Sequence, residues 1–339
     1  MDARGAEKPD EVMNGRVEVV DAGIANSIQD LGRLGFRHMG IAVSGCLDPM
    51  LARCANALAG NPAQAACIEV RAAGPKLAVR RGPVRFALSG DLSATLVRAD
   101  GEAFEIPAWQ SVTLEAGDEL HVGFLPGGVA YVAVSGGFAT PVQLGSRSTY
   151  QRAEIGVPLT LDAQIPCAVL SPEECGGAGG EECHFVASPW AHAEGPIRVI
   201  LGPQDDHFTA ASIADLLDGE YRATTQSDRM GMRLEGKALV HREPALADIV
   251  SDGVAPGVIQ VPGNGQPIIL LADCQTVGGY PKIATVISAD LPRLAQVRPG
   301  QALRFAAVDA AQAAQARAAQ EAQWRMWAAT IEMVSGAGC

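Results

Sequence analysis

The sequence predicts a mainly β protein with a few helices, folded as two β-barrel-like lobes followed by a C-terminal helix. Its 339 residues suffice for two domains, and the 38 Gly and 21 Pro favour turns between short strands. Two distant stretches also echo each other, Ala116-Gly-Asp-Glu-Leu-His-Val122 and Pro299-Gly-Gln-Ala-Leu-Arg-Phe305. Each is typical of a turn that feeds a strand, and one such pair indicates two related barrels in preference to a solenoid.

Four segments follow from the order of these signals. We expect a disordered leader at 1–14, an N-terminal β-rich lobe at 15–195, a C-terminal barrel lobe at 196–308 and a helix at 309–339. The leader is charged and lacks the apolar run of a secretory signal.

Within the first lobe, the alternating stretch Arg16–Val20 predicts the opening strand. Asp48-Pro49 predicts a helix start and Gly60 its end, so we interpret Asp48 as a cap in preference to a catalytic group.

Two further helices are expected. Phe208 to Asp218 predicts a short one, which Gly219 ends. Ala310 to Val334 is rich in Ala and Gln and lacks Gly and Pro, which predicts one long helix. Its apolar stripe should dock on the protein's own barrel and consists of Trp324, Trp327, Ile331 and Val334.

Composition excludes several classes of function. The formal net charge of -12 argues against a nucleic-acid protein, which needs a surplus of Lys and Arg. No apolar run approaches the roughly 18 residues of a membrane span. The eight Cys form no CxxC pair and no zinc-type ligand spacing, so we expect no metal and free thiols in a reducing cytoplasm.

The stretch from Ser251 to Ala289 carries the strongest functional signal. Three short apolar runs, Val258–Val261, Pro267–Ala272 and Ile283–Ile287, predict buried strands. The loops between them hold many polar side chains, as binding loops on a rigid scaffold do. A run of β-turns whose polar side chains satisfy only the backbone explains the same pattern. Both interpretations stay open.

Negative findings narrow the chemistry of the chain. Gly236-Lys237 is followed by Ala238, which rules out a Walker loop, and Gly263-Asn-Gly265 lacks the third glycine of a dinucleotide site. There is also no Met-Lys-Met biotin-attachment tripeptide and no Gly-x-Ser-x-Gly elbow. If the chain is catalytic, a partner protein must supply the energy or the cofactor.

Several co-linear motifs together resemble one family. They are Ile28-Gln-Asp-Leu-Gly-Arg33, Val43-Ser-Gly-x-x-Asp48, Gly145-Ser-Arg-Ser-Thr149, Ser227-Asp-Arg-Met-Gly231 and Gln275-x-x-Gly-Gly-Tyr-Pro-Lys282. This combination is similar to the biotin-dependent carboxyltransferase A/B-domain family. That family includes the C subunit of 5-oxoprolinase, the KipA-like regulators, the allophanate hydrolase subunit 2-like proteins and part of urea carboxylase. Val277 departs from the usual threonine.

The resemblance implies fold, partners and activity. It implies a cyclophilin-like second barrel and two companions. One is a C/D-type carboxyltransferase-domain protein, like KipI or the B subunit of 5-oxoprolinase, and the other is a lactam-utilisation protein, like its A subunit. The favoured activity is ATP-dependent hydrolysis of 5-oxo-L-proline to L-glutamate, with no cofactor bound by this chain alone and ATP supplied through the partners. Two alternatives stay open: a biotin-dependent carboxyltransferase acting on urea or a similar amide, and a non-catalytic KipA-type regulator that binds a kinase inhibitor.

Under the favoured activity, the motifs supply candidate site residues. Cations could neutralise a substrate carboxylate or phosphate, carboxylates could orient water or act as general base, and neutral amides suit a lactam ring. The candidate catalytic residues are Asp273, Asp228 and Lys282. The candidate substrate-binding residues are Arg229, Arg147, Asn264, Gln266, Gln275 and Tyr280. For Asp228 and Arg229, a local salt bridge or a turn stays an equal alternative.

Overall fold

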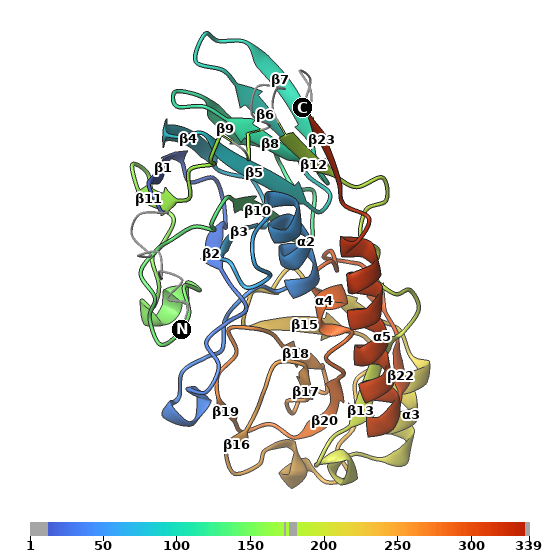
Figure 1. Ribbon diagram of the computed structural model, residues 1–339. Coiled ribbons are helices and arrows are strands. Elements are labelled where there is room, and N and C mark those ends of the chain that lie inside the picture. Colours follow the sequence, from blue (N-terminus) through green and yellow to red (C-terminus); the bar gives the residue numbers. More distant parts are fainter. Residues whose placement is uncertain (1–12, 173, 176–181, 336–339) are drawn as a thin grey trace, which may run out of the picture. The chain divides into compact units, whose positions relative to one another are not determined.

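The computed structural model describes residues 13–172, 174–175 and 182–335 (Figure 1). The predicted leader at 1–14 lies outside this part except for Met13 and Asn14. The chain divides into two compact units. Unit 1 comprises the described residues of 1–31, 50–190 and 327–339, and unit 2 comprises 32–49 and 191–326. The predicted boundaries place 32–49 in the first lobe, whereas the contacts of this segment lie with unit 2.

Unit 1 consists mainly of two antiparallel sheets. The six-stranded sheet runs in the order β11 (Gln164–Cys167), β1 (Gly15–Asp21), β4 (Lys76–Arg81), β9 (Glu119–Val122), β6 (Ser93–Val97) and β7 (Ala103–Pro107). The five-stranded sheet runs in the order β2 (Ser27–Gln29), β3 (Cys67–Val70), β10 (Ala130–Val134), β5 (Val84–Ser89) and β8 (Ser111–Leu114). One hydrophobic cluster takes side chains from both sheets, including Val17, Leu77, Phe86 and Val132. The sheets therefore share a core.

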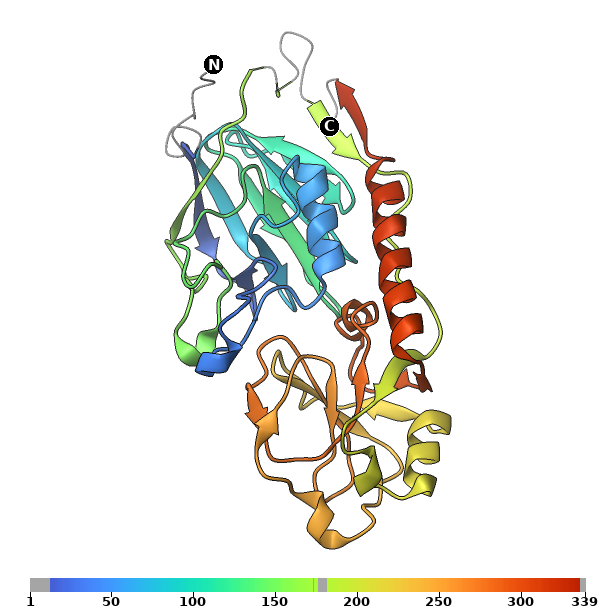
Figure 2. The ribbon, with the colours of Figure 1, turned by 60° about the horizontal axis from the view of Figure 1, so that its bottom comes forward.

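Helix α2 (Pro49–Ala59) packs on the five-stranded sheet (Figure 2). Ser89 Oγ on β5 donates to the Leu51 carbonyl at 2.7 Å, and Gly60 ends the helix at a φ of 80°. Both predicted ends of this helix are confirmed. Asp48 immediately precedes it and is fully buried, and its side chain accepts hydrogen bonds from His192 Nε2 at 2.7 Å and Gln296 Nε2 at 2.8 Å. Asp48 therefore also joins distant parts of unit 2.

Unit 2 is built on an eight-stranded sheet. Its order is β21 (Ala302–Leu303), β14 (Tyr221–Ala223), β15 (Gly231–Glu235), β18 (Ile268–Leu270), β17 (Val258–Gln260), β20 (Lys282–Val286), β13 (Ile197–Leu201) and β22 (Phe305–Ala307). The first and last strands in this order are separated in the chain by Arg304 alone, which brings the two ends of the sheet together. The sheet is therefore a nearly closed barrel, and the predicted mainly β fold with a barrel lobe is confirmed.

Short elements complete the two units. In unit 2 they are η1 (Arg37–Met39), η4 (Asp205–His207), α3 (Ala210–Asp218), η5 (Pro244–Ala247), the paired β16 (Asp252–Gly253) and β19 (Val277–Gly278), and α4 (Leu291–Leu294). In unit 1 they are η2 (Gln151–Ala153) and the paired β12 (Glu182–Phe185) and β23 (Glu332–Ser335). Thr209 caps α3 by accepting a hydrogen bond from Ser212 N at 3.1 Å, so the predicted helix begins two residues later than Phe208.

The C-terminal helix is shorter than the sequence pattern predicts. Helix α5 spans Ala310–Ala328, and the chain then forms β23 instead of continuing as a helix to the end. Thr330 directs both its backbone N and its Oγ1 to the Trp327 carbonyl, and the β-branched residues that follow favour an extended chain.

Of the predicted apolar stripe, Trp327 is buried within unit 1. Its ring makes edge contacts with Trp109 and Trp190, and its Nε1 donates to the Ser188 carbonyl at 3.0 Å. Ile331 lies beyond the helix, and the side chain of Val334 is outside the described part. Trp324 is half-buried on α5, so Trp327 is the one residue of the predicted stripe that the structure describes as buried.

Candidate functional site

An ion pair links the end of β18 to the loop before β15. Arg229 Nε donates to Asp273 Oδ2 at 2.8 Å, and Arg229 Nη2 donates to Asp273 Oδ1 at 3.1 Å. The backbone joins the same two residues, since Asp273 N donates to the Arg229 carbonyl at 2.9 Å. Their side chains are only 12% and 10% exposed. Such a two-pronged, nearly buried pair fixes both loops in one geometry.

The segment at 32–49 packs against these loops. Ser44 N donates to the Ala272 carbonyl at 2.9 Å, and Arg229 Nη2 donates to the Gly45 carbonyl at 2.7 Å. Arg37 on η1 reaches two further carbonyls, those of Val254 and Gln275. Three of the motifs that carry the family resemblance therefore meet in unit 2, although they lie far apart in the chain.

Lys282 begins β20 and is almost fully buried. Its Nζ donates to Asp252 Oδ2, and to the Gly253 carbonyl at 3.2 Å. The hydrogen bond from Lys282 holds the pKa of Asp252 below its usual value. The pairing of Asp252 with Gly278 places β16 where this contact can form. Sequence analysis missed Asp252 because an Asp-Gly pair is also an ordinary turn signal.

Three candidate residues form side-chain hydrogen bonds with the backbone, of which those of Asp228 and Asn264 are local turn contacts. Asp228 is exposed, and its Oδ1 accepts hydrogen bonds from Met230 N at 2.8 Å and Gly231 N at 3.2 Å. Asn264 Oδ1 accepts from Gln266 N at 3.1 Å, and the Gln266 side chain bonds both backbone groups of Gly236. These are the backbone-satisfying contacts that the turn interpretation predicts.

Asn264 and Gln266 also line a cavity of about 440 Å³ in unit 2. Thr224, Gln226 and Arg233 contribute to the same wall. The two candidate amides are thus brought together, and they lie at a cavity even though part of their polar surface serves the turn.

Gln275 and Tyr280 lie on the loop between Asp273 and Lys282. Gln275 is half-buried, and its carbonyl accepts a hydrogen bond from Arg37 at 3.1 Å. Tyr280 is 40% exposed, and its carbonyl accepts a hydrogen bond from Gln260 Nε2 at 3.1 Å. Backbone contacts thus hold this loop at both residues, and Tyr280 presents a partly exposed ring.

Arg147 belongs to unit 1, apart from the other eight candidates. It lines a separate cavity of about 300 Å³ together with Asp30, Gln64 and Phe138. The nine candidates therefore comprise the ion pair Arg229–Asp273, a lysine paired with a missed aspartate, three residues that bond the backbone, the two loop residues Gln275 and Tyr280, and one arginine in unit 1.

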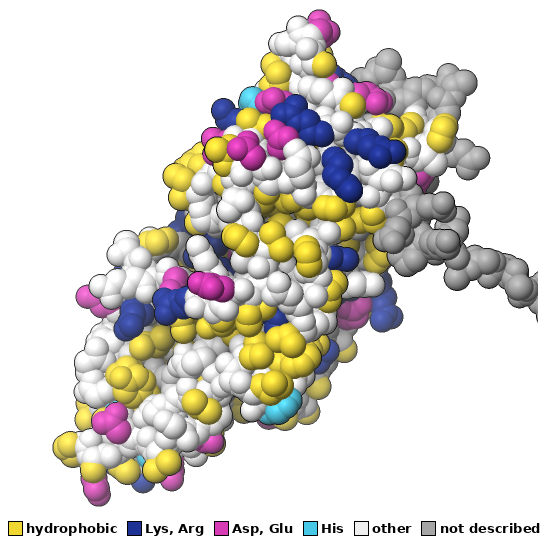
Figure 3. Space-filling model, turned by 90° about the vertical axis from the view of Figure 1, so that its left-hand side faces the viewer, with side chains coloured by type: hydrophobic (Ala, Val, Ile, Leu, Met, Phe, Trp, Pro, Cys, Tyr) yellow, Lys and Arg dark blue, Asp and Glu magenta, His cyan; other side chains and the backbone are white. Residues whose placement is uncertain are grey.

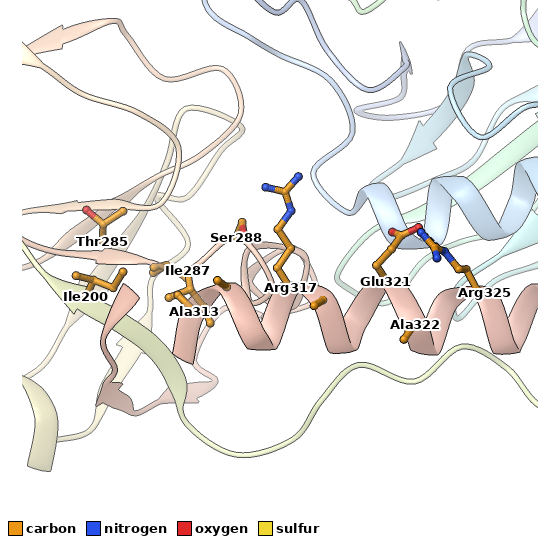
Figure 4. A pocket seen from close by; sticks show the side chains of 12 residues that line it. Ile200, Thr285, Ile287, Ser288, Ala313, Arg317, Glu321, Ala322 and Arg325 are labelled. Atoms are coloured by element: carbon orange, nitrogen blue, oxygen red, sulfur yellow. Dashed lines mark ion pairs between the residues drawn. The ribbon is translucent and has the colours of Figure 1, made fainter. Parts of the chain in front are cut away.

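A larger cavity, of about 760 Å³, lies along α5 in unit 2 (Figure 4). Ala313, Arg317 and Ala322 line it from the helix, and Ile200 and Thr285 from strands β13 and β20. None of the candidate residues is among those that line it, so this groove is not the site that the motifs indicate.

Other features bear on the classes that the sequence excluded. In the described ranges, no three His, Cys, Asp or Glu side chains are grouped to hold a metal ion. The described helices include none with the length and apolar character of a membrane span. On the face shown in Figure 3, Asp and Glu side chains lie beside the Lys and Arg side chains.

None of the cysteines whose side chains are described forms a disulfide: Cys46, Cys54, Cys67, Cys167, Cys175 and Cys274. Burial raises the pKa of Cys67 and of Cys167 to about 12, and it also raises the pKa of Cys274. Cys274 sits beside Asp273, yet a buried thiol with a raised pKa is a poor nucleophile.

Comparison with known proteins places the chain in one family. The sequence matches the carboxyltransferase domain, subdomain A and B, over residues 39–307. It is 33% identical to the C subunit of 5-oxoprolinase from Escherichia coli over 85% of this chain and 90% of the relative, and 34% identical to the C subunit of the Haemophilus influenzae enzyme over 86% and 91%. The solved structure of Kluyveromyces lactis urea carboxylase aligns with a TM-score of 0.78 at 25% identity, covering 92% of this chain and 29% of that one. The chain therefore belongs to the carboxyltransferase subdomain A and B family.

Proposed function

We propose that this chain is the C subunit of an ATP-dependent 5-oxoprolinase, and that it hydrolyses 5-oxo-L-proline to L-glutamate together with partner subunits. The observation that carries the proposal is the similarity to two proteins named as the C subunit of 5-oxoprolinase, which extends over at least 90% of their length. The motifs that meet in unit 2 lie within residues 39–307, the range that matches the carboxyltransferase family.

The chemistry explains why partners are needed. An amide carbonyl is a poor electrophile, so opening the lactam ring requires activation by ATP, for example as a phosphorylated imidate that water then attacks. The sequence has no Walker loop, and we therefore assign ATP to the partners and no cofactor to this chain alone. The partners we propose are a C/D-type carboxyltransferase-domain protein and a lactam-utilisation protein.

Within unit 2, we assign Asp273 the role of orienting the attacking water. Arg229 occupies one lone-pair position on each carboxylate oxygen, and a second position on each oxygen remains for water. Arg229 then acts as a positioning residue that fixes the orientation of the Asp273 carboxylate.

Reconstitution tests the proposal. The purified chain alone should produce no glutamate from 5-oxoproline and ATP, and a mixture with both partners should produce glutamate and ADP. Omitting each protein in turn controls for contaminating hydrolases. Turnover by the single chain, or a complete complex that does not consume 5-oxoproline, would overturn the assignment.

The urea carboxylase similarity favours one second candidate, a carboxyltransferase component that moves a carboxyl group from carboxybiotin to urea or a similar amide. The same reconstituted complex separates the two, because this activity requires a biotinylated carrier and bicarbonate. A complex that consumes neither substrate but binds a kinase inhibitor would indicate the KipA-type regulator instead.

A further inference from the structure

The three candidate cations of the sequence differ in what already neutralises them. Arg229 is paired with Asp273, and Lys282 with Asp252. The guanidinium of Arg147 has no carboxylate at ion-pairing distance within the described ranges, although the residue is only half-exposed. Its one side-chain neighbour of opposite charge in the cavity wall is Asp30.

Asp30 holds the backbone of Arg147 and leaves its guanidinium free. Asp30 Oδ2 accepts from Arg147 N at 2.6 Å, and Asp30 Oδ1 accepts from Ser146 Oγ and Ser148 Oγ, both at 2.6 Å. Ser146 and Ser148 are 1% and 0% exposed, so these bonds are shielded from water. The Asp30 carboxylate thus accepts hydrogen bonds from a buried network, and this network fixes the position of the Arg147 backbone from which the side chain extends.

A second set of contacts locks this segment to β2. Thr149 N donates to the Ile28 carbonyl at 2.9 Å, Gln29 Nε2 donates to the Thr149 carbonyl at 3.0 Å, and Asp30 N donates to Ser148 Oγ at 3.0 Å. Two of the family motifs therefore meet in unit 1. Their contacts hold the backbone of Arg147, whose guanidinium is unpaired, in one position.

The cavity beside Arg147 has the size and lining for a small acid. Its volume of about 300 Å³ lies at the lower end of the range for small-molecule sites. Val142, which is 57% exposed, gives it apolar surface, and Gln64 an amide. The backbone turns through Gly136 and Gly137 at φ values of 75° and 76°, which a side chain would disfavour. One guanidinium in such a setting matches a single carboxylate through two parallel hydrogen bonds.

We propose that this cavity in unit 1 binds a small carboxylic acid, with Arg147 as the carboxylate-binding residue. The identity of the acid as 5-oxoproline or its product rests on the proposed function; the carboxylate chemistry does not. Arg229 and Lys282 are then structural cations and take no part in holding the carboxylate.

Calorimetric titration of the full, unliganded chain tests this inference without the partners. 5-Oxo-L-proline should bind saturably, and 2-pyrrolidinone, the same lactam without the carboxylate, should not. Arg147→Gln should weaken binding of 5-oxoproline at least tenfold, and Arg147→Lys should weaken it less, because lysine keeps the charge and loses the two-pronged geometry. The matched control is Arg152→Gln, an exposed arginine on η2 that does not line the cavity and should bind as the wild type does.

Each outcome decides the matter. Equal binding by wild type and Arg147→Gln, equal binding of the two lactams, or no binding of 5-oxoproline, L-glutamate or acetate at millimolar concentration would overturn the inference. Tighter binding of inorganic phosphate than of any carboxylate would also overturn it. If the chain binds acetate or L-glutamate through Arg147 but the reconstituted complex has no 5-oxoprolinase activity, the site stands and the proposed function fails. If the complex turns over, and Arg147→Gln changes neither its KM nor the binding of carboxylates by the single chain, the function stands and the site fails.

Discussion

Replacing Arg229 by methionine should destabilise unit 2, and the size of the effect follows from burial. The variant leaves the Asp273 carboxylate 10% exposed and without its two guanidinium bonds. It also removes the donor to the Gly45 carbonyl. Breaking a buried pair by removing one partner costs about 3–5 kcal/mol. At the lower end, about 3 kcal/mol corresponds to a fall in Tm of roughly 6–12 °C for a domain of some 150–250 residues.

Thermal melting and a double-mutant cycle measure this. Asp273→Asn should destabilise to a comparable degree, and the double variant should lose at least about 1 kcal/mol less than the sum of the two. The matched control is Arg222→Met, which removes an exposed arginine paired with Glu220 and should change stability by about 0–1 kcal/mol. If Arg229→Met melts like this control while turnover of the complex collapses, Arg229 is a ligand-binding cation and the positioning role is refuted.

Three further results are expected. Asp252→Asn should lower Tm more than Lys282→Met, because the first leaves a buried ammonium and the second a carboxylate that is 60% exposed; equal shifts would contradict this asymmetry. At pH 8, iodoacetamide should label Cys46 far faster than Cys67, whose pKa burial raises to about 12; peptide mass spectrometry showing equal rates would contradict the buried assignment. Burial alone would raise the pKa of Asp290, but hydrogen bonds from an arginine outweigh it and lower the pKa. The contribution of Asp290 to the stability of the folded protein is therefore present at neutral pH and lost on acidification below about pH 4. Asp290→Asn should accordingly make Tm less dependent on pH in that acidic range.

The fold was largely predictable because its signals are local. The apolar runs at Val258–Val261, Pro267–Ala272 and Ile283–Ile287 became β17, β18 and β20, and the Asp48-Pro49 start marks α2. Such signals depend on residue spacing within a few positions. The end of α5 was missed because no Gly or Pro follows Ala328 until Gly336, whereas pairing of β23 with β12 is a long-range contact.

The site was less predictable because the sequence around a charged residue does not indicate which residue it pairs with in the fold. The sequence indicated that Lys282 and Asp273 are polar residues in loops, but it could not show that the first pairs with Asp252 and the second with Arg229. Sequence reasoning also kept 32–49 with the first lobe, since nothing local signals that Arg37 bonds the carbonyl of Gln275. The contact of Arg37 with Gln275 joins residues 238 positions apart, and the two ion pairs join residues 44 and 30 positions apart. Only the fold brings such residues together.

The motifs fall in both units, and in each unit an aspartate organises the contacts around them. In unit 1, Asp30 gives its oxygens to a backbone amide and two serines, which leaves Arg147 unpaired at a cavity. In unit 2, Asp273 gives its oxygens to Arg229, which then has little capacity for a ligand anion. A buried cation that is already neutralised gains little from a second anion, whereas an unpaired guanidinium loses no internal contact on binding one. Charge neutralisation within the chain, and not the mere presence of Lys or Arg in a motif, therefore distinguishes the cation that binds from the cations that hold loops in place.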